Sequence, residues 1–141
     1  MINLRLATIE DAEVIFNMCR QFNNTTSATT LAQVETFIKS GVEIISLAIY
    51  DDRPVGFVTG RVEHHLSFGQ PIGTISELFV CEAYRKQGIA TKLFQHMEQE
   101  FLQRDVNRYR VFTTADNKNA VKFYHNQNYQ RFDAVMFRKD V

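Results

Sequence analysis

The sequence predicts a mixed α/β fold, in which helices cover both faces of a mostly antiparallel sheet with a central parallel pair. Apolar residues recur at helical spacing early in the chain, then in alternation over three consecutive segments, and then at helical spacing again. Short polar turns join the three alternating segments, which is typical of an antiparallel meander. A long amphipathic segment and another strand follow, and such a strand–helix–strand unit has parallel strands. The predicted order is β-α-α-β-β-β-α-β-α-β in one domain, residues 1–141.

The first strand is predicted over residues 3–7, where Leu4 and Leu6 alternate with polar residues. Thr8 then has the chemistry of an N-cap, and acidic residues follow it in the first helical turn. The polar run over residues 23–27 is predicted to end this helix. A second helix carries apolar residues at helical spacing and stops at Gly41.

Three strands and a long helix form the middle of the chain. The strands are predicted over residues 43–50, 55–63 and 72–81. The helix carries one broad apolar stripe, made by Ile89, Leu93, Met97 and Phe101 with their neighbours. The last elements are a strand over residues 108–114, a short helix over residues 120–124 and a final strand over residues 131–138.

Composition excludes several classes of protein. Sixteen basic residues balance sixteen acidic ones, whereas a general nucleic-acid binder needs a basic excess. No stretch approaches the ~20 apolar residues of a membrane span, and the first residues lack the apolar run of a signal peptide. Cys19 and Cys81 are too few for a disulfide framework, and no residues have metal-ligand spacing. We therefore expect a soluble, cytoplasmic protein that has no metal and does not contact membranes or nucleic acid.

The loop before the long helix has the chemistry of an anion site. The first backbone N–H groups of a helix are unpaired, and with the helix dipole they attract an anion. Gly88 lets a bulky anion approach the backbone, and Arg85 and Lys86 add positive charge. The spacing of the P-loop is absent, and a single glycine is too few for the dinucleotide fingerprint. The loop alone predicts only an anion site, of a size that fits a pyrophosphate.

Two motifs resemble those of the GNAT superfamily of N-acetyltransferases. The first is Arg85-Lys86-Gln87-Gly88-Ile89-Ala90, which is similar to the family's Arg/Gln-x-x-Gly-x-Gly/Ala signature and follows the strand that contains Glu77 to Val80. The second runs from Asn117 through Ala120 and Phe123 to Tyr124. The element order also matches the family. One departure is Asn128-Tyr129 in place of the family's usual Gly-Phe, and Asn is the non-glycine residue that best tolerates a left-handed C-cap.

The resemblance implies that the chain binds acetyl-coenzyme A. In the family, the last meander strand and the strand after the long helix splay apart, and the pantetheine arm enters the gap like an added strand. Carried over, backbone groups of Phe79 and Val80 would pair with pantetheine, and Asn117 and Phe123 would contact it. The pyrophosphate would be held at the helix N-terminus by Arg85, Lys86, Gln87, Gly88, Ile89 and Ala90.

The resemblance also implies roles in catalysis. Tyr124 matches the family's tyrosine that faces the leaving thiolate, so it is predicted to be the general acid. Glu77 lies on the strand that lines the site and could accept the amine proton, or it could only attract the cationic acceptor. His64 or His65 is the next candidate base, and at most one can face the site, because neighbouring strand residues point to opposite faces. Direct transfer is usual in the family, so Cys81 is not expected to be a nucleophile.

The predicted function is an N-acetyltransferase that moves an acetyl group from acetyl-CoA to a primary amine of a small molecule or protein, by direct transfer in a ternary complex. The alternatives are a non-catalytic acyl-CoA-binding regulatory module and a nucleotide-binding protein. The family's acceptor groove would correspond here to residues 22–30, the loop over residues 64–71 and the last strand. That strand has apolar side chains at the chain end, so a homodimer formed through it is plausible.

Overall fold

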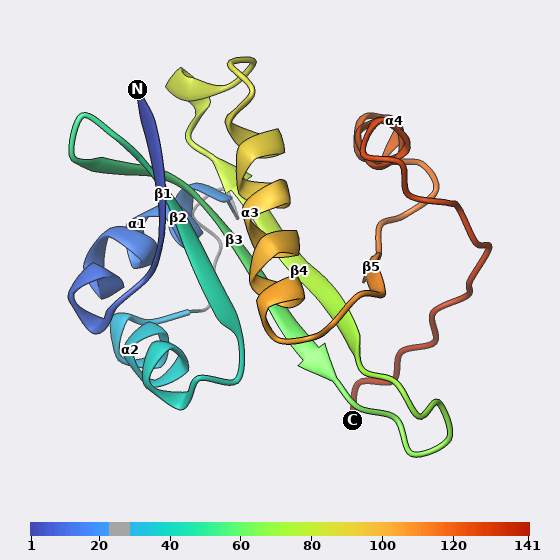
Figure 1. Ribbon diagram of the computed structural model, residues 1–141. Coiled ribbons are helices and arrows are strands. Elements are labelled where there is room, and N and C mark those ends of the chain that lie inside the picture. Colours follow the sequence, from blue (N-terminus) through green and yellow to red (C-terminus); the bar gives the residue numbers. More distant parts are fainter. Residues whose placement is uncertain (23–28) are drawn as a thin grey trace.

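The computed structural model describes residues 1–22 and 29–141, and it contains a five-stranded sheet with helices on both faces (Figure 1). The strands lie in sequence order, antiparallel except for the parallel pair β4–β5. The predicted fold class is confirmed. The elements are β1 (Ile2–Leu6), η1 (Ile9–Asp11), α1 (Ala12–Phe22), α2 (Leu31–Ser40), β2 (Ile44–Tyr50), β3 (Arg53–Glu63), β4 (Ile72–Val80), η2 (Glu82–Tyr84), α3 (Ile89–Gln103), β5 (Tyr109–Val111) and α4 (Lys118–Asn126).

Helices α1 and α2 cover one face of the sheet. Thr8 is the N-cap residue of the short helix η1, which precedes α1. Its backbone N–H donates to the Asp11 carboxylate at 2.7 Å. Thr30 and Gln33 form a capping box at the start of α2, and Gly41 ends it with a φ of 65°. The predicted end of the first helix over residues 23–27 lies outside the described residues. The buried side chains on this face are Ala12, Ile15, Met18, Val34, Ile45, Leu47, Phe57 and Phe79.

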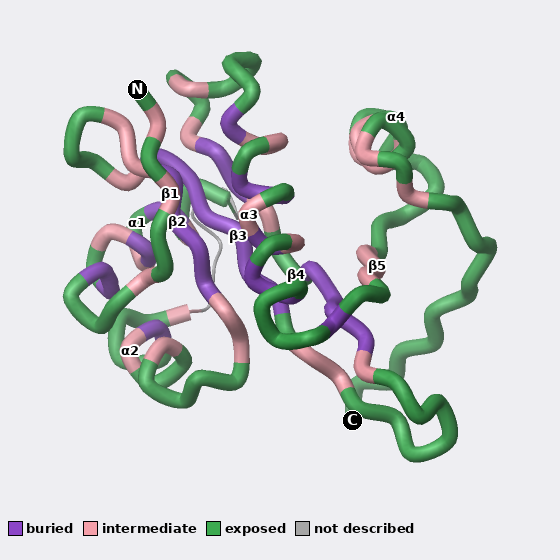
Figure 2. Tube along the Cα trace, viewed as in Figure 1, coloured by how far each residue is buried: buried purple, intermediate pink, exposed green. Residues whose placement is uncertain are grey.

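Helix α3 covers the opposite face and carries the larger core. Its side chains Leu93, Phe94, Met97 and Phe101 are all 0% exposed. Figure 2 shows buried residues on the central strands and along α3. Ser46 of β2, also fully buried, hydrogen-bonds to Nδ1 of His96, which ties α3 to the sheet. The helix therefore has a fixed position, and its first turn is placed at the upper ends of β3 and β4 in Figure 1.

Close approach of α3 depends on glycine in the sheet. A Cβ added to Gly73 would lie 2.5 Å from Cδ2 of Phe101, whose ring is enclosed in the core. We expect Gly73→Ala to lower the free energy of unfolding by about 1–3 kcal/mol, because overpacking forces the ring or the backbone to move. Urea denaturation measures this effect. Ser67→Ala, at an exposed position of the β3–β4 loop, is the control, and an equal effect of both changes would contradict the argument.

The predicted strand over residues 131–138 is wrong, because no strand follows α4 in the structure. A strand forms only where a neighbouring strand accepts its backbone hydrogen bonds. Residues 130–141 run beside the sheet but apart from β5, and their side chains are exposed (Figures 1 and 2). The parallel pair β4–β5 consequently lies at the sheet edge instead of its centre. Strand β5 is also shorter than the predicted 108–114, because the chain leaves the sheet after Val111.

Candidate active site

The parallel strands β4 and β5 pair over only three positions and then separate. Gly73, Thr74 and Ile75 pair with Tyr109, Arg110 and Val111, after which the chain leaves the sheet toward α4. Arg110 secures the paired end, donating to the Glu63 carboxylate at 2.6 Å and to the Thr74 hydroxyl at 3.1 Å. Strand β4 continues to Val80. Within the described residues, its last five positions, 76–80, therefore have no strand on the β5 side, and their backbone is open to a ligand.

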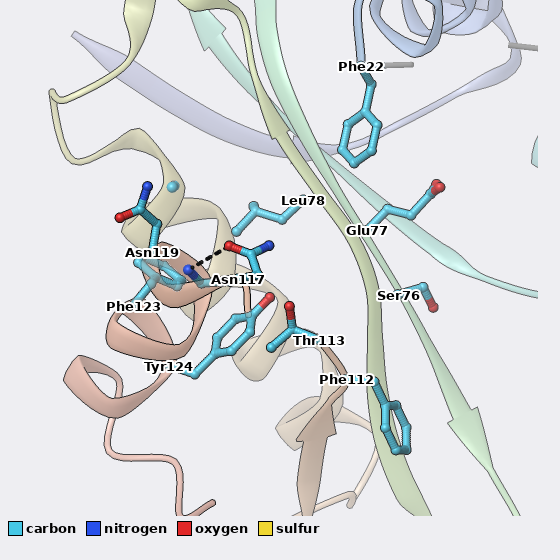
Figure 3. A pocket seen from close by; sticks show the side chains of 12 residues that line it. Phe22, Ser76, Glu77, Leu78, Phe112, Thr113, Asn117, Asn119, Phe123 and Tyr124 are labelled. Atoms are coloured by element: carbon cyan, nitrogen blue, oxygen red, sulfur yellow. Dashed lines mark hydrogen bonds between the residues drawn. The ribbon is translucent and has the colours of Figure 1, made fainter. Parts of the chain in front are cut away.

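A β-bulge at Ser76 sets the direction of the β4 side chains. Thr59 of β3 is opposite Glu77 and Gly60 is opposite Ile75, so Ser76 is the extra residue. The bulge reverses the alternation of β4 at this point. Ile75 and Leu78 therefore face α3 although they are three residues apart, whereas Glu77 and Phe79 face the other side. In Figure 3, Leu78 extends toward Asn117, whereas Glu77 extends away from it on the other side of β4.

A cleft of about 420 Å³ lies where the strands separate. It joins the open edge of β4 to the start of α3 and to one side of α4 (Figure 3). This is the volume range of small-molecule sites, which are typically concave and mostly apolar with a few polar groups. The lining residues are Phe22, Ser76, Glu77, Leu78, Ala90, Phe112, Thr113, Asn117, Asn119, Ala120, Phe123 and Tyr124.

Tyr124 and Asn117 come from α4. The Asn117 side chain caps the helix, with Oδ1 accepting from the Ala120 N–H at 3.2 Å, so its position in the cleft is fixed (Figure 3). The Tyr124 ring packs against the buried Phe94 ring at 5.7 Å between centroids, and its hydroxyl points into the cleft. Burial raises the pKa of the Tyr124 phenol. The hydroxyl is therefore protonated at neutral pH and can donate a proton or a hydrogen bond.

The end of α4 is held by the unusual Asn128-Tyr129 pair. Asn128 has a φ of 67°, as predicted for a left-handed C-cap, and the Tyr129 N–H donates to the Tyr124 carbonyl at 3.1 Å. The Tyr129 hydroxyl donates to Glu98 of α3 at 2.8 Å, and its ring meets Phe94 edge to face. The departure from the Gly-Phe pattern therefore preserves the cap and fastens α4 to α3.

Glu77 lies on the other side of the cleft from Tyr124. Solvent reaches its carboxylate, but the surrounding protein partly desolvates it and thereby raises its pKa, and the negative charge of Glu43 raises it further. Oε1 of Glu43 is buried and has no hydrogen-bond partner among the described residues. A raised pKa makes the ionised Glu77 a stronger base than an ordinary glutamate. Two carboxylates here also favour the approach of a cation.

The loop before α3 presents backbone groups and charge to one end of the cleft. Lys86 and Gly88 both have left-handed conformations, with φ of 62° and 80°, which turn the chain into the first turn of α3. No atom lies within 4 Å of the place where a Gly88 Cβ would be, so the approach is open. Arg85 is exposed; its Nε donates to the Val80 carbonyl at 2.7 Å and its guanidinium lies 5.6 Å from the Phe79 ring centroid. Arg85 thus also satisfies the carbonyl of the last residue of β4.

The predicted residues divide into three groups. Glu77, Ala90, Asn117, Phe123 and Tyr124 line the cleft together. On the adjacent loop, Arg85, Lys86 and Gln87 have exposed side chains, and the Gly88 backbone is exposed. Buried side chains, which leave only backbone groups for a ligand, belong to Phe79, Val80 and Ile89.

Several cleft residues were missed by sequence reasoning. Ser76, Thr113 and Asn119 supply polar groups to the lining. Asn119 lies within the Asn117–Tyr124 motif, which was the available signal for it. Ser76 and Thr113 carry no pattern of their own, since each depends on where β4 bulges and where β5 leaves the sheet.

The alternative base candidates lie elsewhere. Neither His64 nor His65 lines the cleft. His65 lies beyond the end of β3, with Nε2 3.4 Å from the Glu63 carboxylate and its ring against Phe68. Although burial alone would raise the pKa of Glu63, hydrogen bonds from Arg61, Arg110 and Thr74 lower it to about 2. This ionic group braces the paired end of β4 and β5, away from the cleft.

Other chemistries have little support in the described parts of the chain. Burial raises the pKa of the Cys81 thiol, and a protonated thiol is a poor nucleophile. Across residues 1–22 and 29–141, no three His, Cys, Asp or Glu side chains are grouped so that they could hold a metal ion. No helix in the same residues has the length and apolar character needed to cross a membrane.

Comparisons with known proteins found a matching sequence model and similar folds. The sequence model described as the acetyltransferase (GNAT) family matches residues 10–129. No curated protein sequence matches. The fold is similar to an aminoglycoside acetyltransferase from an uncultured soil metagenomic sample, with a TM-score of 0.88 at 17% identity over 99% of this chain and 96% of that one. A ribosomal-protein-alanine N-acetyltransferase from Brucella melitensis biovar Abortus 2308 gives a TM-score of 0.85 at 16% identity over 99% of both chains. Aminoglycoside N-acetyltransferase AAC(6')-Iy, solved in complex with CoA, gives 0.86 at 14% identity over 99% of this chain and 95% of that one.

Proposed function

Because this chain belongs to the GNAT acetyltransferase family, we propose that it transfers the acetyl group of acetyl-CoA directly to a primary amine. The observation that carries the proposal is the open edge of β4 beside the first turn of α3, with Tyr124 on the facing helix. An extended amide-containing arm can pair with an open strand edge, and a pyrophosphate fits a helix N-terminus. Pantetheine and pyrophosphate are the two parts of coenzyme A that these features suit.

Residues around the cleft fit the proposed cosubstrate. Backbone groups of Phe79 and Val80 lie on the open edge, although the Val80 carbonyl already accepts a hydrogen bond from Arg85. The first N–H groups of α3 and the side chains of Lys86 and Gln87 would hold the pyrophosphate, with Arg85 beside them. Asn117 and Phe123 would contact the pantetheine arm across the cleft. Gly88 leaves the space into which the phosphates would fit.

In the proposed reaction, one residue on each side of the cleft transfers one proton. Acetyl-CoA supplies a thioester, whose carbonyl carbon forms a bond to the amine nitrogen as its bond to sulfur breaks. A backbone N–H near Leu78 or Phe79 would donate to the carbonyl oxygen as negative charge develops on it. Glu77 would accept the proton released by the amine, through water, because a free alkyl ammonium has a pKa of about 10. Tyr124 would give its phenolic proton to the leaving sulfur.

The proposed acceptor is a cationic primary amine of a small molecule or a protein. It would approach on the Glu77 side of β4, where the carboxylates of Glu77 and Glu43 repel each other and would both gain from a positive charge. The predicted groove residues 23–28 lie outside the described part of the chain, and the loop over residues 64–71 is beyond the far end of β3. Among residues 22, 29 and 30, the described part of the predicted 22–30 stretch, Phe22 lines the cleft.

The function is tested by measuring thiol release from acetyl-CoA over a broad panel of amines, together with calorimetric titration of acetyl-CoA and ATP. We expect acetyl-CoA to bind and at least one amine to be acetylated. Binding of acetyl-CoA without any turnover would favour the acyl-CoA-binding regulatory module instead. Tighter binding of ATP than of acetyl-CoA would favour a nucleotide-binding protein and contradict the proposal.

Gly88→Ala tests the place of the pyrophosphate. The methyl group would project into the open space at the start of α3, so we expect acetyl-CoA to bind at least about 10-fold more weakly, or about 1.4 kcal/mol. Gly41→Ala is a matched control, because Gly41 is also left-handed, also has no atom near its missing Cβ, and ends α2. Both changes should cause a similar backbone strain of about 1–2 kcal/mol. Equal affinities of the two variants, measured by calorimetry, would contradict the assignment.

A further inference from the structure

Two exposed phenylalanine rings line the cleft, and the proposed reaction uses neither of them. Phe22 at the end of α1 is 40% exposed, and Phe112, directly after β5, is 64% exposed. Both belong to the cleft lining together with Glu77. Apolar side chains that are exposed in a concave site are typically covered when a ligand binds. The two rings therefore offer an apolar contact to a part of the ligand that does not react.

Phe112 lies on the same face of the sheet as Glu77. Tyr109 and Val111 of β5 pack into the core beneath α3, so Arg110 between them points to the opposite face. The Arg110 guanidinium lies 5.2 Å from the centroid of the Phe112 ring, which places that ring on the same side. The hydrogen bonds that secure the paired end of β4 and β5 also fix Arg110. Phe112 is consequently held against a fixed group although it is mostly exposed.

Phe22 is fixed by two other rings on this face. Its ring centroid lies 5.5 Å from that of Phe79 and 6.3 Å from that of Phe57. Phe57 and Phe79 are buried in the core under α1 and α2, so they hold one side of the Phe22 ring and leave the rest open to the cleft. In the view of Figure 3, Glu77 lies between Phe22 and Phe112. A carboxylate is thus flanked by two aromatic rings.

The charges around this site suit an acceptor with one ammonium group. Among residues 1–22 and 29–141, neither Glu77 nor Glu43 forms an ion pair with a cationic side chain. Glu77 is the one acidic side chain of the described cleft lining, and Oε1 of Glu43 is buried. An ammonium group at Glu77 would therefore gain from both negative charges, whereas a second ammonium group would find no further carboxylate in the lining.

We propose that Phe22 and Phe112 bind an aromatic ring of the acceptor while its ammonium group lies at Glu77. The acceptor is then an arylalkylamine with a single positive charge. A ring is favoured over an alkyl chain because aromatic pairs attract one another beyond the effect of the apolar area that they bury. This inference rests on the proposed function, since it names the acceptor of the same site.

Binding of three amines to the chain saturated with CoA tests the proposal, and CoA in place of acetyl-CoA prevents turnover. The amines are 2-phenylethylamine, butylamine and 1,4-diaminobutane, which differ in having a ring, an alkyl chain or a second ammonium group. We expect calorimetry to show that 2-phenylethylamine binds at least about tenfold more tightly than either of the others. Equal affinities, or tightest binding of 1,4-diaminobutane, would overturn the proposal.

The binding readout separates this inference from the proposed reaction. A preference for 2-phenylethylamine without thiol release from acetyl-CoA would support the aromatic acceptor site and contradict the transfer reaction. Acetylation of amines without any preference for a ring would support the transfer reaction and contradict the aromatic acceptor site.

Substitution of the two rings tests their assignment. Phe112→Ala and Phe22→Leu should each lower the ratio of the butylamine Kd to the 2-phenylethylamine Kd at least about fivefold, whereas Phe112→Tyr keeps the ring and should keep the ratio within about twofold. Phe68→Ala is the matched control, because Phe68 is 54% exposed in the β3–β4 loop and does not line the cleft. An unchanged ratio in Phe112→Ala, or an equal fall in Phe68→Ala, would refute the assignment. Circular dichroism of each variant checks that the fold is unchanged.

Discussion

Tyr124→Phe is expected to lower kcat by at least about 100-fold while leaving the affinity for acetyl-CoA nearly unchanged. The change removes one hydroxyl group and keeps the ring that packs on Phe94. If the phenol protonates the leaving sulfur, its loss removes general acid catalysis, which typically contributes a factor of about 10²–10⁴. Stopped-flow or steady-state thiol release gives kcat, and calorimetry gives the affinity.

Tyr129→Phe is the matched control for this experiment. Tyr129 packs against the same Phe94 ring and is also partly buried, but its hydroxyl binds Glu98 and it does not line the cleft. Its substitution should lower stability by about 1–3 kcal/mol, the cost of leaving a hydrogen-bonded partner unsatisfied, and should leave kcat within about twofold. Unchanged turnover in Tyr124→Phe, or equal losses in both variants, would remove Tyr124 from the acid role.

The raised pKa of Tyr124 has a consequence for pH dependence. A general acid acts in its protonated form, so activity supported by Tyr124 persists as pH rises and is lost only above the pKa of the phenol. Burial raises that pKa, so the alkaline limb should lie above the range of an ordinary tyrosine. The limb should be absent from the residual activity of Tyr124→Phe.

Local chemistry made much of the fold predictable. The stop at Gly41 and the left-handed Asn128 each depend on one or two residues, and both are present. The apolar stripe of α3 was readable because Ile89, Leu93, Met97 and Phe101 are all enclosed by the same core. Such features need no knowledge of distant parts of the chain.

The end of β5 and the strand over residues 131–138 were mispredicted for a shared reason. Phe112 and residues 131–138 have strand-like apolar patterns, but such a pattern indicates only that side chains are to be covered. At Phe112 the chain leaves the sheet and lines the cleft, and residues 131–138 form no strand. Pairing depends on a partner backbone, which periodicity within one segment does not encode.

The cleft residues also divide into those that a local motif reveals and those whose placement depends on distant segments. Tyr124 and Asn117 could be found because they belong to a motif on one short helix. The direction of Glu77 depends on the bulge at Ser76, which the sequence indicates only through the three-residue spacing of Ile75 and Leu78. The influence of Glu43 on Glu77 could not be foreseen, since the two residues are brought together only when β2, β3 and β4 assemble.

Glu77→Gln is expected to lower kcat about 10–100-fold at neutral pH and to remove the acid limb of the pH profile. A base acts in its ionised form, so the wild-type rate should rise with pH as Glu77 loses its proton. Desolvation and the charge of Glu43 raise the pKa of Glu77, so this limb should lie above the usual glutamate range. Glutamine has nearly the same shape but cannot accept the proton, so the residual rate should not follow this titration.

The effect of Glu77→Gln on the free energy of unfolding should be opposite in sign to its effect on the rate. A carboxylate whose pKa is raised by folding contributes stability that is fully present below its unfolded pKa and is lost as pH rises through the folded pKa. The ionised Glu77 therefore destabilises the fold at neutral pH, and Glu77→Gln should raise the free energy of unfolding there while it lowers the rate. Urea denaturation at pH 7 and near pH 4 measures this difference, which should disappear at the lower pH.

Glu43→Gln, together with Glu77→Gln, distinguishes two roles for Glu77: a general base, or a residue that only attracts the cationic acceptor. Removal of the Glu43 charge should lower the pKa of Glu77 and move the acid limb to lower pH, with little change in the plateau kcat. If Glu77 only attracts a cation, Glu77→Gln should raise KM with kcat unchanged, because uniform binding is lost without loss of transition-state stabilisation. A fall in kcat at saturating amine, together with the shifted limb in Glu43→Gln, would identify Glu77 as the group that takes the proton.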